Sequence, residues 1–450
     1  MLGRSLVKCK KSVLLFLSAI VCCVVLYAGY CAYLLLEGGH QLRKAIDEAD
    51  RLDPGWRLAD LEQSRAVISD DENSALQVLK ADGLIPDEWW EAEEKERENA
   101  TGQTSQSSLM VKNALVEARK LAAYEKGRFS IGPKLRDSTG RVAWLLACDV
   151  QNLTKQRKTN EAMISGRAIL AVARSIGDEP SMFSQMFRVR SRNWAVRLIE
   201  RTLADGEASE EILRELQDKL QSEESEPLSL TMARAERALC HERLQTCENG
   251  DQSMEEVFGY SPLPEFELPF LSRPLLPHSH AWIIRYFNNL VEACKGPAEK
   301  QKETIQTLSI SVTSASSQVR WILSDWPKFY LRQVHRVLAS RGLLRCAATA
   351  LACERFRLRN NRWPRGLEEL VPDYLQEIPC DPIHGTTVQA RMLEEKMIIC
   401  FPNLKDNSNR SAVPEDVGNG KEIEVSFTLW SPSERKKLSS LRDGRTNRSE

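Results

Sequence analysis

One uncharged segment near the N-terminus constrains this chain more than any other feature. Residues 12–36 read SVLLFLSAIVCCVVLYAGYCAYLLL and contain no charged side chain. At about 1.5 Å of rise per residue, a helix of this length can cross the roughly 30 Å hydrocarbon core of a bilayer. A cleaved signal peptide has a shorter apolar region, about 7–15 residues, and a small-x-small cleavage site, which AGYCA matches poorly. We therefore predict an uncleaved transmembrane anchor.

The charges on either side of this segment predict its orientation. Four basic residues and no acidic residue precede it, whereas basic and acidic residues are mixed after it. Cytoplasmic flanks of membrane spans are enriched in Lys and Arg. We expect a single-pass protein of a bacterial cytoplasmic membrane, with residues 1–36 as a cytoplasmic tail and anchor, and the bulk of the chain outside the cytoplasm. The four basic residues are Arg4, Lys8, Lys10 and Lys11.

Length, charge and motif content exclude several functional classes. A chain of 450 residues is too long for one compact core, so two or three domains are expected. The 62 Lys and Arg balance 63 Asp and Glu, which leaves no basic footprint for nucleic acid, and we expect no nucleic-acid partner. No Cys-x-x-Cys or His-Glu-x-x-His motif is present. His278 and His280, in PHSHAW, are expected in a polar loop before a helix, and we predict neither a metal nor another cofactor.

Most of the chain after the anchor has helical periodicity. Residues 37–108 predict short helices, broken at Pro54-Gly55 and with one helix capped by Asp70 or Asp71, and then a charged linker. Residues 109–342 predict a helical body, either a bundle or an irregular solenoid without a fixed repeat. Pro327 is expected to kink or interrupt a helix of this body. Four arginines of one predicted helix are expected to pair with glutamates on its surface, or alternatively to bind an anion: Arg188, Arg190, Arg192 and Arg197.

Residues 343–430 predict a small α+β unit. A helix of small apolar residues ends at Asn360-Asn361, a pair that tolerates the left-handed backbone conformation of a helix C-terminus. We expect this helix to lie against a three-stranded antiparallel sheet, and residues 431–450 to form a disordered basic tail. The predicted fold is therefore mainly α, with an N-terminal transmembrane helix, a helical bundle or solenoid, and this α+β unit. The last strand alternates polar residues with Ile423, Val425, Phe427 and Leu429.

A punctuated segment, WPRGLEELVPDYLQEIPCDP, connects the long helix to the predicted sheet. Its prolines fix the backbone, and its large apolar residues can pack in between. We interpret it as a structural clamp that holds the helix on the sheet. The clamp residues are Trp363, Pro364, Leu370, Pro372, Tyr374, Pro379, Asp381 and Pro382.

Cysteines offer one possible cross-link in the exported part. Cys380 and Cys400 flank a predicted turn region and could form a disulfide in an oxidising compartment. The alternative is that both are buried free thiols. No cysteine has a histidine beside it in a recognisable catalytic arrangement.

Two resemblances rest on longer stretches. The order RFRLRNNRWPRGLEELVPDYLQEIPCDP followed by a small sheet resembles the C-terminal region of type II secretion major pseudopilins, although DPIHG lacks their Trp-Gly and no prepilin cleavage motif precedes the anchor. Across nearly the whole chain, LDPGWRLADLE and SIGDEPSMFSQMFRVRSRNWAVRLIERTLADGE resemble uncharacterised membrane-anchored proteins typical of planctomycete bacteria. The first resemblance implies an assembly role, and the second implies no particular activity.

The pseudopilin resemblance also implies a possible calcium site in the loop before the last strand. Calcium prefers six to eight oxygen ligands. Only three acids lie in the interior of this loop, and so we expect no calcium: Asp406, Glu415 and Asp416.

Two functional hypotheses remain. The first is a membrane-anchored envelope protein that binds another envelope protein and has no catalytic activity. The second is an exported hydrolase or lyase that uses a pair of carboxylates on a helical scaffold. The candidate carboxylates of the second hypothesis are Asp149, Glu161, Asp178 and Glu236.

Overall fold

The computed structural model describes residues 2–98, 110–129, 134–253, 256–257, 273–297, 326–402 and 425–435, together with residues 301, 304, 307, 308 and 310. The chain forms two compact units, each built from segments that are distant in sequence. Unit 1 comprises residues 1–61, 233–293 and 303–331, and unit 2 comprises residues 62–232, 294–302 and 332–450. The short helix α2 (Leu58–Gln63) contains the first boundary between them.

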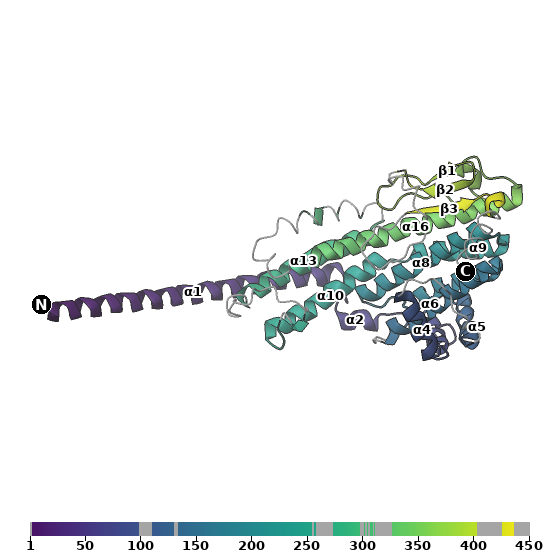
Figure 1. Cartoon of the computed structure of the whole chain (residues 1–450). Coiled ribbons are helices and arrows are strands. Elements are labelled where there is room, and N and C mark those ends of the chain that lie inside the picture. The colour runs from purple at the N-terminus through teal and green to yellow at the C-terminus, as the bar shows by residue number, and fades with distance from the viewer. Residues whose placement is uncertain are drawn as a thin grey trace. The chain divides into compact units, whose positions relative to one another are not determined.

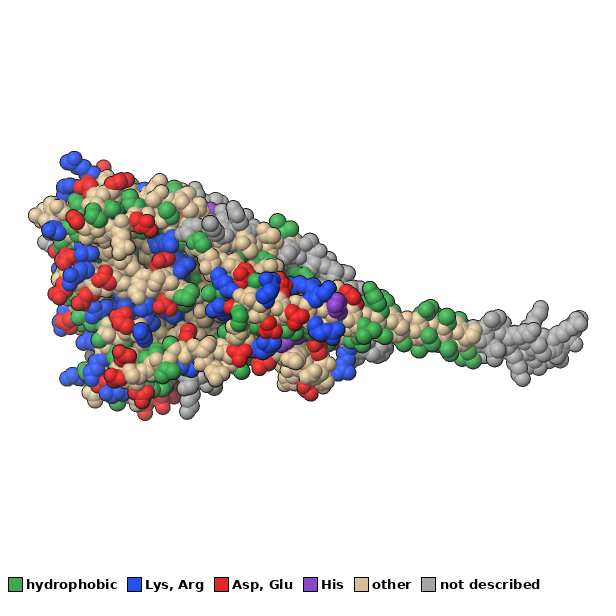
Figure 2. Space-filling model, turned by 180° about the vertical axis from the view of Figure 1, so that it is seen from behind, with side chains coloured by type: hydrophobic (Ala, Val, Ile, Leu, Met, Phe, Trp, Pro, Cys, Tyr) green, Lys and Arg blue, Asp and Glu red, His purple; other side chains and the backbone are tan. Residues whose placement is uncertain are grey.

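Unit 1 contains α1 (Leu2–Leu52), a helix of 51 residues. Within it, Phe16–Leu52 is long and apolar enough to cross a membrane by length and composition. Most large apolar side chains between Phe16 and Leu36 are exposed, and Figure 2 shows hydrophobic side chains along this part of the helix. The prediction of one apolar N-terminal helix is confirmed. The expectation of a separate short helix after residue 36 is wrong, because the anchor helix continues to Leu52. It ends just before Pro54-Gly55, where a break was predicted.

The C-terminal part of α1 packs against α13 (Leu276–Lys295), which lies alongside it in Figure 1. Arg285 donates to the backbone oxygen of Gln41, and the Asn288 amide donates to the backbone oxygen of Ala45, at 3.3 and 3.2 Å. Glycine permits this close approach, since a Cβ on Gly38 would lie 2.9 Å from the His278 ring. Unit 1 also contains η3 (Arg273–Leu275), the part of α10 (Leu228–Asn249) from Ala233 onward, and the first residues of α16.

Unit 2 is a helical body with one continuous hydrophobic core. The core includes residues from α3, α6, α7, α8, α9 and α16, and it extends to the sheet. The α3 helix begins after Asn73, whose side chain accepts from the Ala75 amide, so the expected cap at Asp70 or Asp71 is wrong. The helices are α3 (Ser74–Asp82), α4 (Asp87–Glu98), α5 (Lys112–Lys120), η2 (Leu121–Ala123), α6 (Lys134–Lys155), α7 (Thr159–Arg174), α8 (Met182–Asp205), α9 (Glu210–Glu224) and η4 (Leu367–Leu370).

The long helix α16 (Trp326–Asn360) supports the sheet, which lies against it in Figure 1. The described helix begins at Trp326, so Pro327 lies at its N-terminal end, where a helix tolerates the missing N–H. Residues 311–325 lie outside the described part of the chain, and the expected kink or interruption at Pro327 stays a prediction. Gly342 lies inside the same helix, and a Cβ there would meet the side chains of Val425 and Phe401 at 2.9 and 3.2 Å. The glycine therefore sets how closely helix and sheet approach.

Three short antiparallel strands form the sheet in the order β1-β2-β3: β1 (Gln389–Met392), β2 (Lys396–Cys400) and β3 (Ser426–Trp430). In β3, Phe427 and Leu429 are fully buried, as the alternating pattern predicts. Ile423, which belonged to the same pattern, lies outside the described residues. Asn361 follows α16 with a φ of 56°, the left-handed conformation expected there. The prediction of a mainly α chain with a three-stranded antiparallel sheet is confirmed.

Side chains close the outer edge of β3. Arg197 donates to the backbone oxygen of Ser426 at 2.8 Å, and the amide of Thr428 donates to Glu200 at 2.6 Å. Arg435 donates to the backbone oxygen of Trp430 at 2.8 Å. Arg435 is only 3% exposed, so the predicted disordered tail does not begin at residue 431. Residues 436–450 lie outside the described part of the chain.

Candidate functional site

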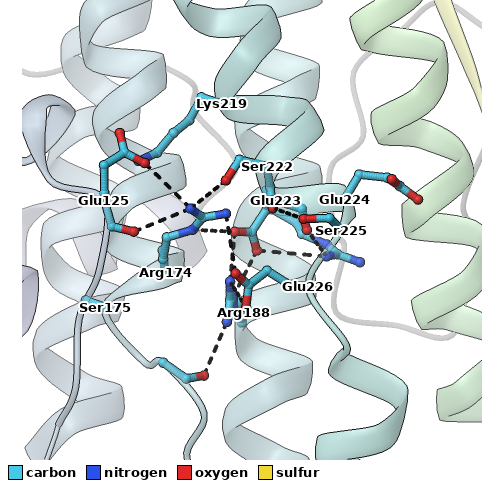
Figure 3. A network of polar contacts seen from close by, with 12 residues as sticks. Glu125, Arg174, Ser175, Arg188, Lys219, Ser222, Glu223, Glu224, Ser225 and Glu226 are labelled. Atoms are coloured by element: carbon cyan, nitrogen blue, oxygen red, sulfur yellow. Dashed lines mark hydrogen bonds and ion pairs between the residues drawn. The ribbon is translucent and has the colours of Figure 1, made fainter. Parts of the chain in front are cut away.

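A buried carboxylate at the end of α9 gathers three arginines in unit 2 (Figure 3). Arg188 donates two parallel hydrogen bonds to Glu223, both of 2.8 Å, and Arg174 donates a third at 2.9 Å. Arg192 approaches the same carboxylate at 3.8 Å and donates to the Glu223 backbone oxygen at 3.4 Å. Glu223 is 1% exposed. Four charged side chains thus meet in the interior of the unit.

The helices of unit 2 bring these residues together. Arg174 ends α7, whereas Arg188 and Arg192 lie one turn apart on α8. Arg192 also donates to Ser340 on α16 at 2.8 Å, and the Ser340 hydroxyl donates to Asn193 at 2.5 Å. The network therefore joins α7, α8, α9 and α16.

Electrostatics fix the ionisation of this cluster. Burial alone would raise the pKa of Glu223, but Arg188, Arg174 and Arg192 lower the pKa to about 2. Burial lowers the pKa of Arg192 to about 10, and Glu223 only partly opposes this shift. Among the described residues, no oxygen accepts a hydrogen bond from Nη2 of Arg192. Positive charge is thus incompletely balanced at Arg192.

The rim of the cluster is more exposed. Lys219 binds Glu125 at 2.9 Å and donates to the backbone oxygen of Tyr124 at 2.7 Å. Glu226 lies 3.3 Å from Arg188 and 3.8 Å from Arg174. Figure 3 shows Glu125 and Glu226 on different sides of the arginines. These acids add negative charge where the cluster meets solvent.

This arrangement favours structural cohesion over acid–base chemistry. A carboxylate whose pKa is about 2 is a weak base near neutral pH, and the arginine hydrogen bonds occupy both oxygens of Glu223. The expectation that Arg188 and Arg192 pair on the helix surface is wrong, because both side chains are buried. Their pairing with a glutamate was predicted correctly.

Of the carboxylates proposed for a hydrolase, Asp149 and Glu161 both act on Arg119, whereas Asp178 and Glu236 have other surroundings. Asp149 is buried and accepts from Arg119 at 2.6 and 2.8 Å and from Ser165 at 2.6 Å. Glu161 is exposed, and Asp178 pairs with Arg65 at 3.0 Å. Glu236 is buried in unit 1, whereas the other three belong to unit 2. No described contact pairs two of these four acids.

A second polar network lies in unit 1, around Asp53. Arg234 donates to both Asp53 oxygens at 3.0 and 3.1 Å, and Arg237 also binds this carboxylate. Burial alone would raise the pKa of Asp53, but the two arginines lower it. Arg237 donates further to Asn288 at 3.1 Å, and its guanidinium lies 5.1 Å from the centre of the Trp56 ring. The segment after α1 is thereby tied to α10 and α13.

Next to this network, two histidines and a glutamate form a hydrogen-bonded chain. Nδ1 of His241 lies 2.9 Å from Nε2 of His280, and Nδ1 of His280 lies 3.0 Å from Glu248. The His241 ring contacts Trp56, with the ring centres 5.0 Å apart. His280 is fully buried and lies within α13, so the prediction of a polar loop at His278 and His280 is wrong.

The predicted clamp residues lie around the junction of α16 and the sheet. Trp363 is half-buried beneath Arg357, at 5.6 Å, and Tyr374 is buried against Phe356, with ring centres 5.8 Å apart. Pro364, Leu370 and Pro382 are buried, and Pro379 is half-buried. Pro372 is exposed, so its predicted place in the hydrophobic clamp is wrong.

Asp381 organises the turn that follows the clamp. Its amide donates to the Thr386 oxygen at 2.7 Å, and its carboxylate accepts from the Ile383 amide at 2.9 Å and lies 2.6 Å from Nδ1 of His384. The Gly385 amide donates to the backbone oxygen of Asp381 at 2.8 Å. Asp381 thus serves the local backbone.

The described cysteines are free thiols. Cys400 is buried in β2 and Cys380 is half-buried beside Thr387, so of the two alternatives the structure has free thiols. Burial raises the pKa of Cys240, Cys346 and Cys353, which makes these thiols poor nucleophiles. Among the described residues, no group of three His, Cys, Asp or Glu side chains is arranged to hold a metal. Asp406, Glu415 and Asp416 lie outside those residues.

Sequence reasoning missed both buried networks. Glu223 lies 31 residues or more from each of its arginine partners, and His280 lies 39 residues from His241. No local sequence motif marks these residues. Their partners could have been predicted only from knowledge of which helix faces pack against each other. Comparison with protein-family models, with curated proteins and with solved structures found no match.

Proposed function

We propose that this chain is a single-pass, membrane-anchored envelope protein whose folded part binds another envelope protein and catalyses no reaction. The continuity of α1 is the observation that carries this proposal. One helix contains the exposed apolar stretch and also packs, through Gly38, Ala45 and Ala49, inside unit 1. Such a helix attaches a folded unit to a bilayer without a flexible linker.

The buried acids favour the non-catalytic part of this proposal over acid–base catalysis. Glu223, Asp53 and Glu354 each accept hydrogen bonds from at least two arginines. An acid–base mechanism needs a carboxylate that can exchange a proton near the working pH. The arginines hold the pKa of each of these carboxyls below its usual range, although burial alone would raise it.

The orientation proposed from the flanking charges places the N-terminus in the cytoplasm of a bacterial cell and the two units outside the cytoplasmic membrane. Protease digestion of intact spheroplasts tests this directly. We expect the folded part to be cut from outside, while a tag at residue 1 stays protected. A protected folded part with an accessible tag would reverse the orientation.

Site-specific photo-crosslinking tests partner binding in native membranes. A crosslinking amino acid is placed, one position at a time, at four exposed residues in different segments of the full-length chain. We expect at least one position to capture a single abundant envelope protein. If all four positions give only background, while the chain remains folded in the membrane, the binding role is overturned. The positions are Val67, Leu79, Phe183 and Met392.

A further inference from the structure

Three side chains of unit 1 form a linear chain of hydrogen bonds between α10 and α13. His241 and Glu248 lie seven residues apart on α10, which puts them on one face of the helix, about two turns apart. His280, on α13, lies between them and contacts both, at 2.9 and 3.0 Å. The side chain of His280 is 1% exposed, and that of Glu248 is 18% exposed. The chain therefore runs from the half-buried His241 through a buried ring to a carboxylate.

These contacts determine which nitrogen of each neutral ring carries hydrogen. An ionised Glu248 can only accept, so Nδ1 of His280 must donate to it. Nε2 of a neutral His280 then has only a lone pair and accepts from Nδ1 of His241. Nε2 of His241 is left with a lone pair at the end of the chain. Both rings are therefore Nδ1–H tautomers, whereas a free imidazole is not held in one tautomer.

Charged groups of several elements surround this chain. Asp50 of α1 and Arg57 of the following segment act on His241 from the side of Trp56, and Asp50 itself binds both Arg57 and the Trp56 indole. The guanidinium of Arg237, on α10, lies 5.1 Å from the centre of the Trp56 ring. On α13, His280 is the titratable group that faces His241. Protonation of His241 is therefore opposed by Arg57 and favoured by Asp50.

We propose that Glu248, His280 and His241 form a proton-controlled latch between α10 and α13. A proton binds to Nε2 of His241, and His241 passes its Nδ1 proton to Nε2 of His280. His280 becomes an imidazolium that faces the Glu248 carboxylate, and His241 becomes the Nε2–H tautomer. One proton enters, every hydrogen bond of the chain is kept, and the contact with Glu248 becomes an ion pair, which is stronger than a neutral hydrogen bond.

A second proton opens the latch. It can bind only to Nδ1 of His241, so two N–H groups would face each other across the present 2.9 Å contact. Both rings would then be positively charged, with Arg57 nearby, and like charges at this distance repel. Burial, and then His280 and Arg57, lower the pKa of His241 to about 4, although Asp50 raises it. The opening is therefore expected in acid, near pH 4.

Nitrogen NMR of the full-length protein in nanodiscs, with labelled histidine, tests the latch. At pH 7.5 we expect both His241 and His280 as Nδ1–H tautomers. As the pH is lowered toward 4, His280 should gain its second proton first, while His241 changes to the Nε2–H tautomer. An Nε2–H tautomer of His241 at pH 7.5, or simultaneous titration of the two rings as independent groups, would overturn the proposal.

Hydrogen exchange reports the opening itself. In the wild type, residues 233–249 and 276–295 should lose protection together near pH 4, by at least tenfold. His241→Gln cannot take up the second proton, so its loss of protection should move to lower pH by at least one unit. His384→Asn, which removes an exposed histidine of unit 2, should leave both segments unchanged. Equal loss of protection in the wild type and His241→Gln would contradict the latch, and the wild-type tautomers decide the matter if the variant misfolds.

Discussion

Arg188 and Glu223 bind each other through two hydrogen bonds of 2.8 Å in the interior of unit 2, where neither side chain is more than 2% exposed. A bidentate arginine–carboxylate pair of this kind has little freedom of orientation. Because Arg174 donates to the same carboxylate from another helix, the pair fixes three helices at once. Removing the shared carboxylate leaves the arginines charged and buried, and Arg188 and Arg174 then have only the more distant Glu226 and Glu125 as acidic partners.

Glu223→Gln should therefore destabilise unit 2 strongly. Loss of one partner of a buried ion pair costs about 3–5 kcal/mol, and here three arginines lose their carboxylate. Denaturant unfolding of the full chain, followed by tryptophan fluorescence, measures the change. Glu369→Gln removes a half-exposed partner of Arg362 and should cost far less, because solvent-exposed ion pairs contribute little to stability. Similar losses for the two variants would refute the central role of Glu223.

The acid stability of unit 2 should depend on the same residue. The pKa of Glu223 is about 2 in the folded chain and 4.5 for an ordinary glutamate, so unfolding takes up a proton in between. Its contribution is fully present above pH 4.5 and is lost as the pH falls toward 2, at up to about 1.4 kcal/mol per pH unit. The difference in unfolding free energy between the wild type and Glu223→Gln should shrink over this window. If the difference in unfolding free energy between the two proteins stays constant from pH 5 to pH 2, Glu223 does not cause the acid dependence of stability.

Arg192→Met should be less harmful than Arg188→Met. Both arginines are buried, but Arg188 makes the bidentate contact, whereas Arg192 lies 3.8 Å from the carboxylate and has one nitrogen without an acceptor among the described residues. Methionine fills similar space without a buried charge. We expect Arg188→Met to cost at least about 2 kcal/mol more in the same unfolding experiment. The reverse order would show that Arg192 is the principal partner.

Gly342→Ala should destabilise the junction of α16 and the sheet. Alanine favours a helix by about 1 kcal/mol over glycine, but overpacking typically costs about 1–3 kcal/mol. The new Cβ would lie 2.9 Å from Val425 and 3.2 Å from Phe401, so hydrogen exchange of β2 and β3 should accelerate. Gly39→Ala meets no atom within 4 Å and should be neutral or slightly stabilising. Unchanged exchange in Gly342→Ala would mean that the sheet can move away freely.

Periodicity and capping rules predicted much of the fold. The apolar stretch of residues 12–36, the helical body and the alternating pattern at Val425, Phe427 and Leu429 depend on local sequence, and the structure contains each of them. Helix continuity was harder to predict. Gly342 disfavours a helix interior, yet it lies within α16, where it lets the sheet approach closely.

The buried networks could not be predicted from sequence, for a physical reason. A charged or polar residue is stable in a protein interior only when a partner is brought to it by the tertiary fold. Arg188, Arg192 and His280 have partners on other helices. The local sequence around each of them therefore predicts a surface position. Arg435 behaves in the same way, since it binds Glu354 across 81 residues of sequence.

The closed edge of β3 has a consequence for self-association. Arg197, Glu200 and Arg435 occupy the backbone groups of Ser426, Thr428 and Trp430 that point away from β2. An unprotected edge strand is a template on which another chain can add a strand and begin a fibre. A copy that tried to extend the sheet at β3 would first have to displace three charged side chains, two of them anchored on α8. Fibre growth through this edge is therefore blocked within each molecule by its own helix and C-terminal segment.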